Sequence, residues 1–128
     1  MSLRDTLRVM VVDDMSISRA LISQSLDDLG ITHYIVENDS RTALGKLVAQ
    51  PVHLVISDMN MPGLTGLQLL EALRHSKPTQ KIGFILITGS PTPEIIRTGQ
   101  ELGLNNLIRK PFTTATIRAS IESVFGKL

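Results

Sequence analysis

The sequence contains no cysteine and no tryptophan, and its aromatic residues are one tyrosine and three phenylalanines. Without cysteine there is no disulfide framework, no thiolate metal site and no cysteine nucleophile. So few aromatic rings also exclude a stacking platform for nucleic-acid bases. The net charge is +1, from 13 basic and 12 acidic residues, which is too small for an electrostatic grip on nucleic acid. We therefore expect no nucleic-acid partner.

Long apolar runs are absent as well. No run approaches the ~20 residues that cross a bilayer, and residues 1–8 lack the apolar region of a signal peptide. These absences predict a cytosolic protein without a membrane partner. The chain has 128 residues, of which 42% are hydrophobic and 20% charged, so it is too apolar to be disordered. It is expected to form one domain, residues 1–128, with no output domain.

Five short apolar runs alternate with five segments of helical periodicity. The runs cover residues 7–12, 34–36, 52–56, 84–87 and 107–108, and the helical segments cover 16–29, 40–49, 65–74, 93–102 and 117–128. Thr92-Pro93-Glu94 is typical of a helix start, and Gly30 and Gly103 are typical of the position just after a helix. Because strand–helix–strand crossovers are right-handed, this alternation predicts an α/β fold with a doubly wound parallel sheet.

Polar residues directly follow four of the five apolar runs: Asp13-Asp14, Ser57-Asp58, Thr88-Gly89 and Arg109-Lys110-Pro111. In an open parallel sheet, sites form at the carboxyl ends of the strands, so these side chains are expected to meet at one edge. Two like charges ~4 Å apart repel by roughly 4 kcal/mol at an effective dielectric near 20, and three carboxylates therefore need a cation. Oxygen ligands without thiolate favour Mg²⁺ or Mn²⁺ over zinc.

Four of these segments together are similar to a known family. Val11–Asp14, Val55–Gly63, Ile87–Gly89 and Lys110–Thr113 resemble the receiver domain of two-component response regulators. The resemblance extends from Leu7 to Leu128 and is strongest to stand-alone chemotaxis regulators of the CheY type. It implies a flavodoxin-like (βα)₅ sheet with strand order 2-1-3-4-5 and a cis Lys110–Pro111 bond.

The resemblance also implies roles for individual residues. Asp58 is the expected phosphoacceptor, which receives a phosphoryl group from a phosphohistidine on a chemotaxis-type histidine kinase. Asp14, Asp58 and the backbone carbonyl of Asn60 are expected to bind Mg²⁺ directly, with Asp13 acting through water. Lys110 and Thr88 are expected to contact the phosphoryl oxygens. This division suits phosphoryl transfer, which depends on positioning and on neutralising charge at the equatorial oxygens.

The resemblance is compatible with two kinds of target for such a protein. A CheY-like monomer can bind the flagellar motor switch protein when phosphorylated, or it can act as a phosphate sink or relay intermediate for a shared kinase. The resemblance places the partner surface at Pro91, Ile96, Leu107 and Arg109. Leu107 is expected at the surface, in the centre of this group, where related regulators often carry an aromatic residue.

Three alternatives share the fold class. An FMN-binding flavodoxin-like protein would need a first loop that accepts a phosphate dianion, and Asp13-Asp14 would repel it. An aspartate-nucleophile phosphatase needs an acid two residues after the nucleophile, and Asn60 stands at that position and cannot supply a proton. A dinucleotide-binding module is excluded because no Gly-x-Gly-x-x-Gly follows the first apolar run.

Overall fold

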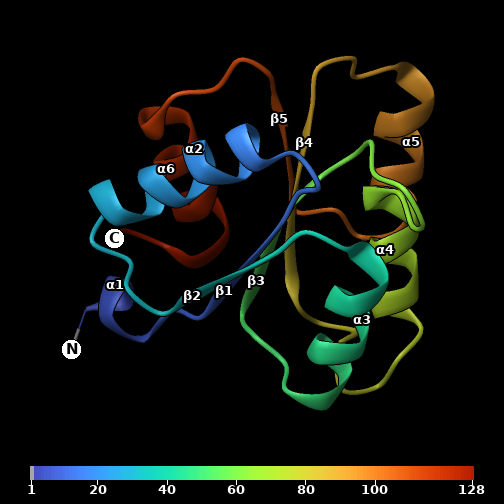
Figure 1. The fold of residues 1–128 in the computed structure, drawn as a ribbon, viewed down its shortest axis with the longest axis horizontal. Helices are drawn as coiled ribbons and strands as arrows, with labels where there is room; N and C mark the ends of the chain where they lie inside the picture. Colours follow the sequence, from blue (N-terminus) through green and yellow to red (C-terminus); the bar gives the residue numbers. More distant parts are fainter. Residues whose placement is uncertain (1) are drawn as a thin grey trace.

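The computed structural model describes residues 2–128, in which five parallel strands form a single sheet. The strands are β1 (Val9–Val12), β2 (Tyr34–Glu37), β3 (Leu54–Asp58), β4 (Gly83–Thr88) and β5 (Asn106–Arg109). Their order across the sheet is β2-β1-β3-β4-β5 (Figure 1). The predicted α/β class, the flavodoxin-like topology and the strand order are therefore confirmed.

Helices cover both faces of this sheet. They are α1 (Leu3–Thr6), α2 (Ser16–Asp28), α3 (Ser40–Ala49), α4 (Gly66–Arg74), α5 (Pro93–Glu101) and α6 (Thr114–Phe125). Figure 1 shows α2 and α6 on one face and α3, α4 and α5 on the other. The short helix α1 is not predicted from the sequence, because it has no apolar stripe. The backbone N–H and the hydroxyl of Ser2 both donate hydrogen bonds to the Asp5 carboxylate and stabilise its first turn.

Side chains that alternate along each strand divide the core into two clusters. On β1, Val9 and Val11 pack on the side of α2 and α6, whereas Met10 and Val12 pack on the side of α3 and α4. Every residue of β1, β3 and β4 is buried. This is the burial expected of central strands in a sheet that helices cover on both sides. The three strands whose ends carry Asp13, Asp58 and Thr88 are thus firmly held.

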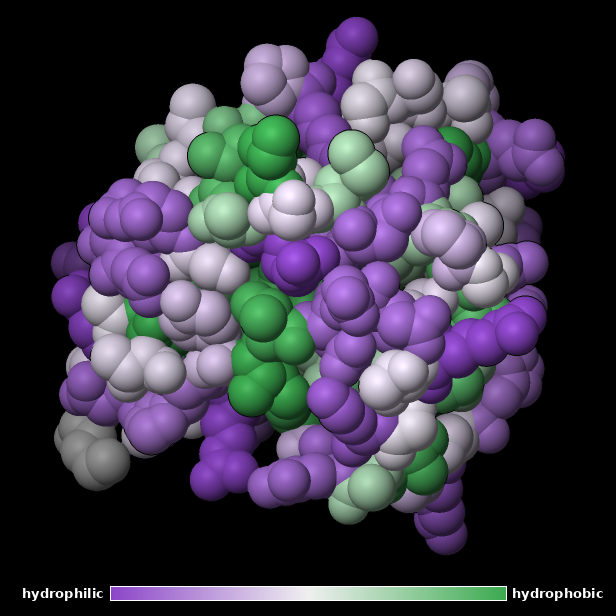
Figure 2. Space-filling view, viewed as in Figure 1, coloured by the Kyte–Doolittle hydropathy of each residue, from purple (hydrophilic) through white to green (hydrophobic). Residues whose placement is uncertain are grey.

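The edge strand β2 differs from the central strands. Its two middle residues, Ile35 and Val36, are 50% and 46% exposed. Ile17 and Leu21 on α2 are exposed as well, and Figure 2 shows hydrophobic areas over α2 and β2 on this face of the molecule. An apolar run in the sequence therefore identifies β2 as a strand but does not reveal that one of its edges is free.

The predicted helix boundaries are confirmed at the positions where their chemistry is most specific. The Thr92 side chain accepts a hydrogen bond from the backbone N–H of Ile95, and Pro93 is the first residue of α5. Gly30 and Gly103 follow α2 and α5 with φ values of 78° and 71°, the left-handed conformation that glycine adopts readily. The Lys110–Pro111 peptide bond is cis, as predicted. Within residues 2–128, no helix is long and apolar enough to cross a membrane.

Candidate functional site

The register of the sheet brings the predicted polar residues together. Val12 pairs with Ser57, Asp58 pairs with Ile87, and Thr88 pairs with Arg109. The residues that end or directly follow β1, β3, β4 and β5 therefore lie at one edge of the sheet. They are Asp13, Asp14, Asp58, Thr88 and Lys110.

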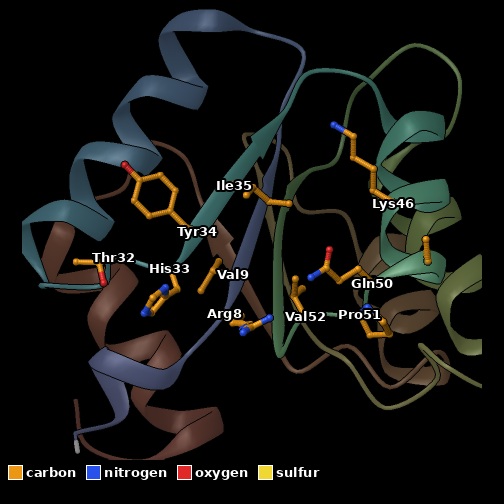
Figure 3. A pocket seen from close by; sticks show the side chains of 11 residues that line it. Arg8, Val9, Thr32, His33, Tyr34, Ile35, Lys46, Gln50, Pro51 and Val52 are labelled. Atoms are coloured by element: carbon orange, nitrogen blue, oxygen red, sulfur yellow. The ribbon is translucent and has the colours of Figure 1, made fainter.

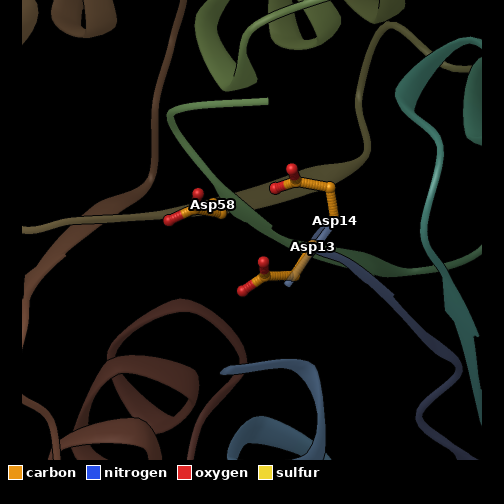
Figure 4. Close-up of side chains that lie close together, drawn as sticks. All are labelled: Asp13, Asp14 and Asp58. Carbon is orange, nitrogen blue, oxygen red and sulfur yellow. The ribbon is translucent and has the colours of Figure 1, made fainter. Parts of the chain in front are cut away.

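The three aspartates form a compact cluster. One carboxylate oxygen from each of Asp13, Asp14 and Asp58 lies within 4.8 Å of the others. Figure 4 shows the three carboxylates directed to the same side of the strand ends. Asp13 and Asp58 are buried, with 0% and 5% exposure, and Asp14 is more open. The cluster thus concentrates up to three negative charges at a site with little water to screen them.

Asp58 has one close cationic neighbour. The ammonium Nζ of Lys110 lies 2.7 Å from Asp58 Oδ1. Burial of Asp58 raises the pKa of its carboxyl group, and the charges of Asp13 and Asp14 raise it further, whereas Lys110 acts in the opposite direction. The lysine therefore neutralises only part of the charge of the cluster.

Two buried carboxylate oxygens of the cluster indicate which kind of ion fits it. Asp13 Oδ1 accepts a hydrogen bond of 2.9 Å from the backbone N–H of Met15. Among residues 2–128, Asp13 Oδ2 and Asp14 Oδ1 are buried and have no hydrogen-bond partner. A buried carboxylate oxygen without a partner is costly, and a hard cation removes that cost. The residues present therefore fit Mg²⁺.

The remaining predicted site residues lie around this cluster. Thr88 is 1% exposed, and its hydroxyl accepts a hydrogen bond of 3.2 Å from the backbone N–H of Ser90. The backbone N–H of Lys110 donates to the carbonyl oxygen of Thr88 at 2.9 Å, which ties the end of β5 to the end of β4. Asn60 lies in the loop between β3 and α4, two residues after Asp58. All of these residues end or follow strands that are neighbours in the sheet, so the pairing of the strands determines where the site lies.

The residues of the predicted partner surface differ in exposure. Ile96 is 43% exposed and Arg109 is exposed, whereas Pro91 is half-buried. Leu107 is half-buried and packs against the core cluster on the side of α3, α4 and α5. Leu107 is therefore only partly at the surface, because part of its side chain packs against this cluster. Its role in binding a partner stays a prediction.

A cavity of about 600 Å³ lies at the other end of the strands. It lies beside the beginnings of β1 and β2 and the end of α3, and Arg8, His33, Ile35, Gln50 and Val52 are among its lining residues (Figure 3). The carboxylates occupy the carboxyl ends of the strands instead. The cavity is therefore separate from the aspartate cluster.

The chain matches a family model for the response regulator receiver domain over residues 9–122. It belongs to the response regulator receiver domain family. Receiver domains are signalling domains that bind Mg²⁺ at an acidic pocket, and Asp13, Asp14 and Asp58 form an acidic cluster in this chain. The resemblance inferred from the strand-end motifs is therefore confirmed.

Relatives of similar length extend this comparison. The chain is 38% identical over 128 residues to a probable chemotaxis protein CheY of Rhizobium etli, covering 100% of this chain and 99% of the relative. It is 31% identical to chemotaxis protein CheY of Pseudomonas aeruginosa, covering 95% and 98% of the two chains. A crystal structure of chemotaxis protein CheY4 of Vibrio cholerae matches with a TM-score of 0.85 and 28% identity, covering 93% and 98%. The likeness thus spans whole CheY chains.

Two residues that shape the site were missed by reasoning from the sequence. Ser40, at the start of α3, is 1% exposed and contacts the loop that carries Asn60. Gly66, at the start of α4, lies against the backbone of Asp58. A serine after an aspartate and a glycine after a threonine both suggest ordinary helix starts, so nothing local in the sequence indicates these contacts.

Proposed function

We propose that this chain is a stand-alone response regulator that accepts a phosphoryl group on Asp58 from a phosphohistidine of a chemotaxis-type histidine kinase. The observation that supports this most directly is the position of Asp58. It lies 2.7 Å from Lys110 and in a cluster with two further carboxylates. This arrangement offers a nucleophile, a cation and a metal site at one sheet edge.

Each group has a distinct task in the transfer. A carboxylate oxygen of Asp58 attacks phosphorus, the P–N bond to the donor imidazole breaks, and the imidazole nitrogen retains the electron pair. Lys110 then moves its ammonium group from the carboxylate to a phosphoryl oxygen. Asp14, Asp58 and the Asn60 carbonyl would hold Mg²⁺ directly, with Asp13 acting through water, and the ion would supply positive charge to the phosphoryl oxygens. Mn²⁺ suits the same oxygen ligands.

The Thr88 hydroxyl couples phosphorylation of Asp58 to a movement of the loop before α5. Thr88 ends the strand next to β3, and the residues after it lead into α5. A hydroxyl that turns from Ser90 toward the new phosphoryl group would draw the segment from Gly89 to Pro93 with it. The exposed side of α5 and β5, including Ile96 and Arg109, is then the surface presented to a flagellar motor switch protein. A phosphate sink uses the same pocket but needs no such partner.

The test is phosphotransfer from the autophosphorylated chemotaxis kinase of the same organism. We expect the labelled phosphoryl group to move from the kinase to this chain in Mg²⁺ or Mn²⁺. In excess chelator it should remain on the kinase. Binding of the motor switch protein that depends on phosphorylation would support the motor output, and efficient transfer without such binding would favour the phosphate sink. Transfer at full rate in chelator would contradict the metal assignment.

Replacement of the lysine should impair the chemistry and spare the fold. In Lys110→Ala we expect phosphorylation by an acyl phosphate to slow by about 100- to 1,000-fold, because one contact that stabilises charge in the transition state is lost. The protein should remain folded, because the Lys110 side chain is 32% exposed. Its thermal midpoint should fall moderately without Mg²⁺, because buried Asp58 loses its cationic neighbour, and less in Mg²⁺. Lys81→Ala removes an exposed lysine outside the site and serves as the control. A large loss of thermal stability in Lys110→Ala alone would indicate a structural role instead.

A further inference from the structure

The segment between β2 and α3 contacts both loops that border the aspartate cluster. At one end, the carbonyl oxygen of Glu37 accepts a hydrogen bond of 3.1 Å from the backbone N–H of Asp13. At the other end, the Ser40 side chain reaches the loop between β3 and α4. Residues 37–40 thus fix the position of the loop with Asp13 and Asp14 relative to the loop with Asn60.

Ser40 makes two hydrogen bonds to that loop. Its hydroxyl donates to the carbonyl oxygen of Pro62 at 3.2 Å and accepts from the backbone N–H of Leu64 at 2.9 Å. The described residues 60–64 make no other hydrogen bond in the structure. One buried hydroxyl therefore satisfies both a donor and an acceptor of a loop that otherwise lacks backbone partners.

The contact is also close in space. Gly63 has a φ of 77°, and a Cβ atom at this position would lie 3.4 Å from Ser40 Oγ. The Met61 side chain, 8% exposed, anchors the same loop in the core. Before the loop, the backbone N–H of Met59 donates to the Ile87 carbonyl at 3.0 Å. The Asn60 carbonyl therefore lies in a short stretch that is held by the sheet on one side and by Ser40 on the other.

We propose that Ser40 is a positioning residue that holds the β3–α4 loop so that the Asn60 carbonyl is available to the metal. This inference rests on the proposed function, because it assigns Ser40 a task only if Asn60 is a ligand. Contacts that orient a ligand without touching the metal commonly change metal affinity by about 10- to 100-fold. Ser40 acts on the loop and not on the ligand atom, so we expect an effect at the lower limit of this range.

The experiment compares Ser40→Ala with Ser25→Ala. Ser25 is also buried, and its hydroxyl lies 3.0 Å from that of Thr114 between α2 and α6, on the opposite face of the sheet. We expect Ser40→Ala to raise the Mg²⁺ dissociation constant of the unphosphorylated protein about tenfold by calorimetric titration. Hydrogen exchange of the Leu64 amide should accelerate in the same variant. Ser25→Ala should change neither quantity, even where it lowers the thermal midpoint equally.

Ser40→Thr retains the hydroxyl, and we expect it to restore both the Mg²⁺ affinity and the protection of the Leu64 amide. An unchanged Mg²⁺ dissociation constant in Ser40→Ala would overturn the inference, as would an equal weakening in Ser25→Ala. A wild-type protein that binds no Mg²⁺ and accepts no phosphoryl group would instead contradict the proposed function. If Ser40→Thr does not fold, the comparison of Ser40→Ala with Ser25→Ala still decides the matter.

Discussion

Asp58→Asn is expected to abolish phosphorylation while leaving the protein folded. A neutral amide lacks the negatively charged oxygen that attacks phosphorus, and no other carboxylate takes its place beside Lys110, whose Nζ lies 2.7 Å from Asp58 Oδ1. The change preserves the size of the side chain and removes one charge from a crowded cluster. The thermal midpoint without Mg²⁺ should therefore be no lower than in the wild type.

The measurement is the incorporation of label from an acyl phosphate and from a phosphorylated kinase, each in Mg²⁺. Asp28→Asn is the matched control, because it removes an exposed carboxylate at the end of α2, away from the cluster. We expect normal incorporation in the control and none in Asp58→Asn. Stoichiometric label on Asp13 or Asp14 in the Asp58→Asn protein would show that the phosphoacceptor has been assigned to the wrong carboxylate.

The residues of the cluster could be predicted because each one occupies the end of a strand. Burial of β1, β3 and β4 produces apolar runs in the sequence, and the polar residue that ends each run marks the edge of the sheet. Parallel pairing then brings Asp13, Asp58 and Thr88 together without any further information. The strand order and the cis Lys110–Pro111 bond were expected from the family resemblance instead, and both agree with the structure.

Features that depend on contacts across the fold could not be predicted in this way. The hydrogen bonds of Ser40 join residues 22 and 24 positions apart in the chain. The half-buried position of Leu107 depends on packing against the cluster under α5, and the exposure of Ile35 depends on the free edge of β2. Such properties are set by neighbouring elements, and the residue types themselves are compatible with either outcome.

The close approach of α4 to the backbone of Asp58 makes Gly66 a position where one added methyl group should have a large effect. A Cβ atom on Gly66 would lie 2.5 Å from the carbonyl oxygen of Asp58 and 2.5 Å from Leu86 Cδ1. The same atom would lie 3.1 Å from Met59 Cα. Leu86 can rotate away, but the backbone of Asp58 and Met59 belongs to the end of β3. The first turn of α4 or the end of β3 must therefore shift in Gly66→Ala.

We expect Gly66→Ala to lower stability by ~3 kcal/mol, the upper part of the usual cost of overpacking, and the thermal midpoint by about 10 °C. Because the displaced backbone carries Asp58, phosphorylation should also slow at temperatures where the variant is fully folded. Gly45→Ala is the control: Gly45 lies within α3, and apart from its chain neighbours and the nearby backbone of α3 no atom lies within 4 Å of the added Cβ. There, alanine should stabilise by ~0.5–1 kcal/mol. Thermal unfolding followed by circular dichroism measures both variants, and equal midpoints would contradict the close packing of α4 on β3.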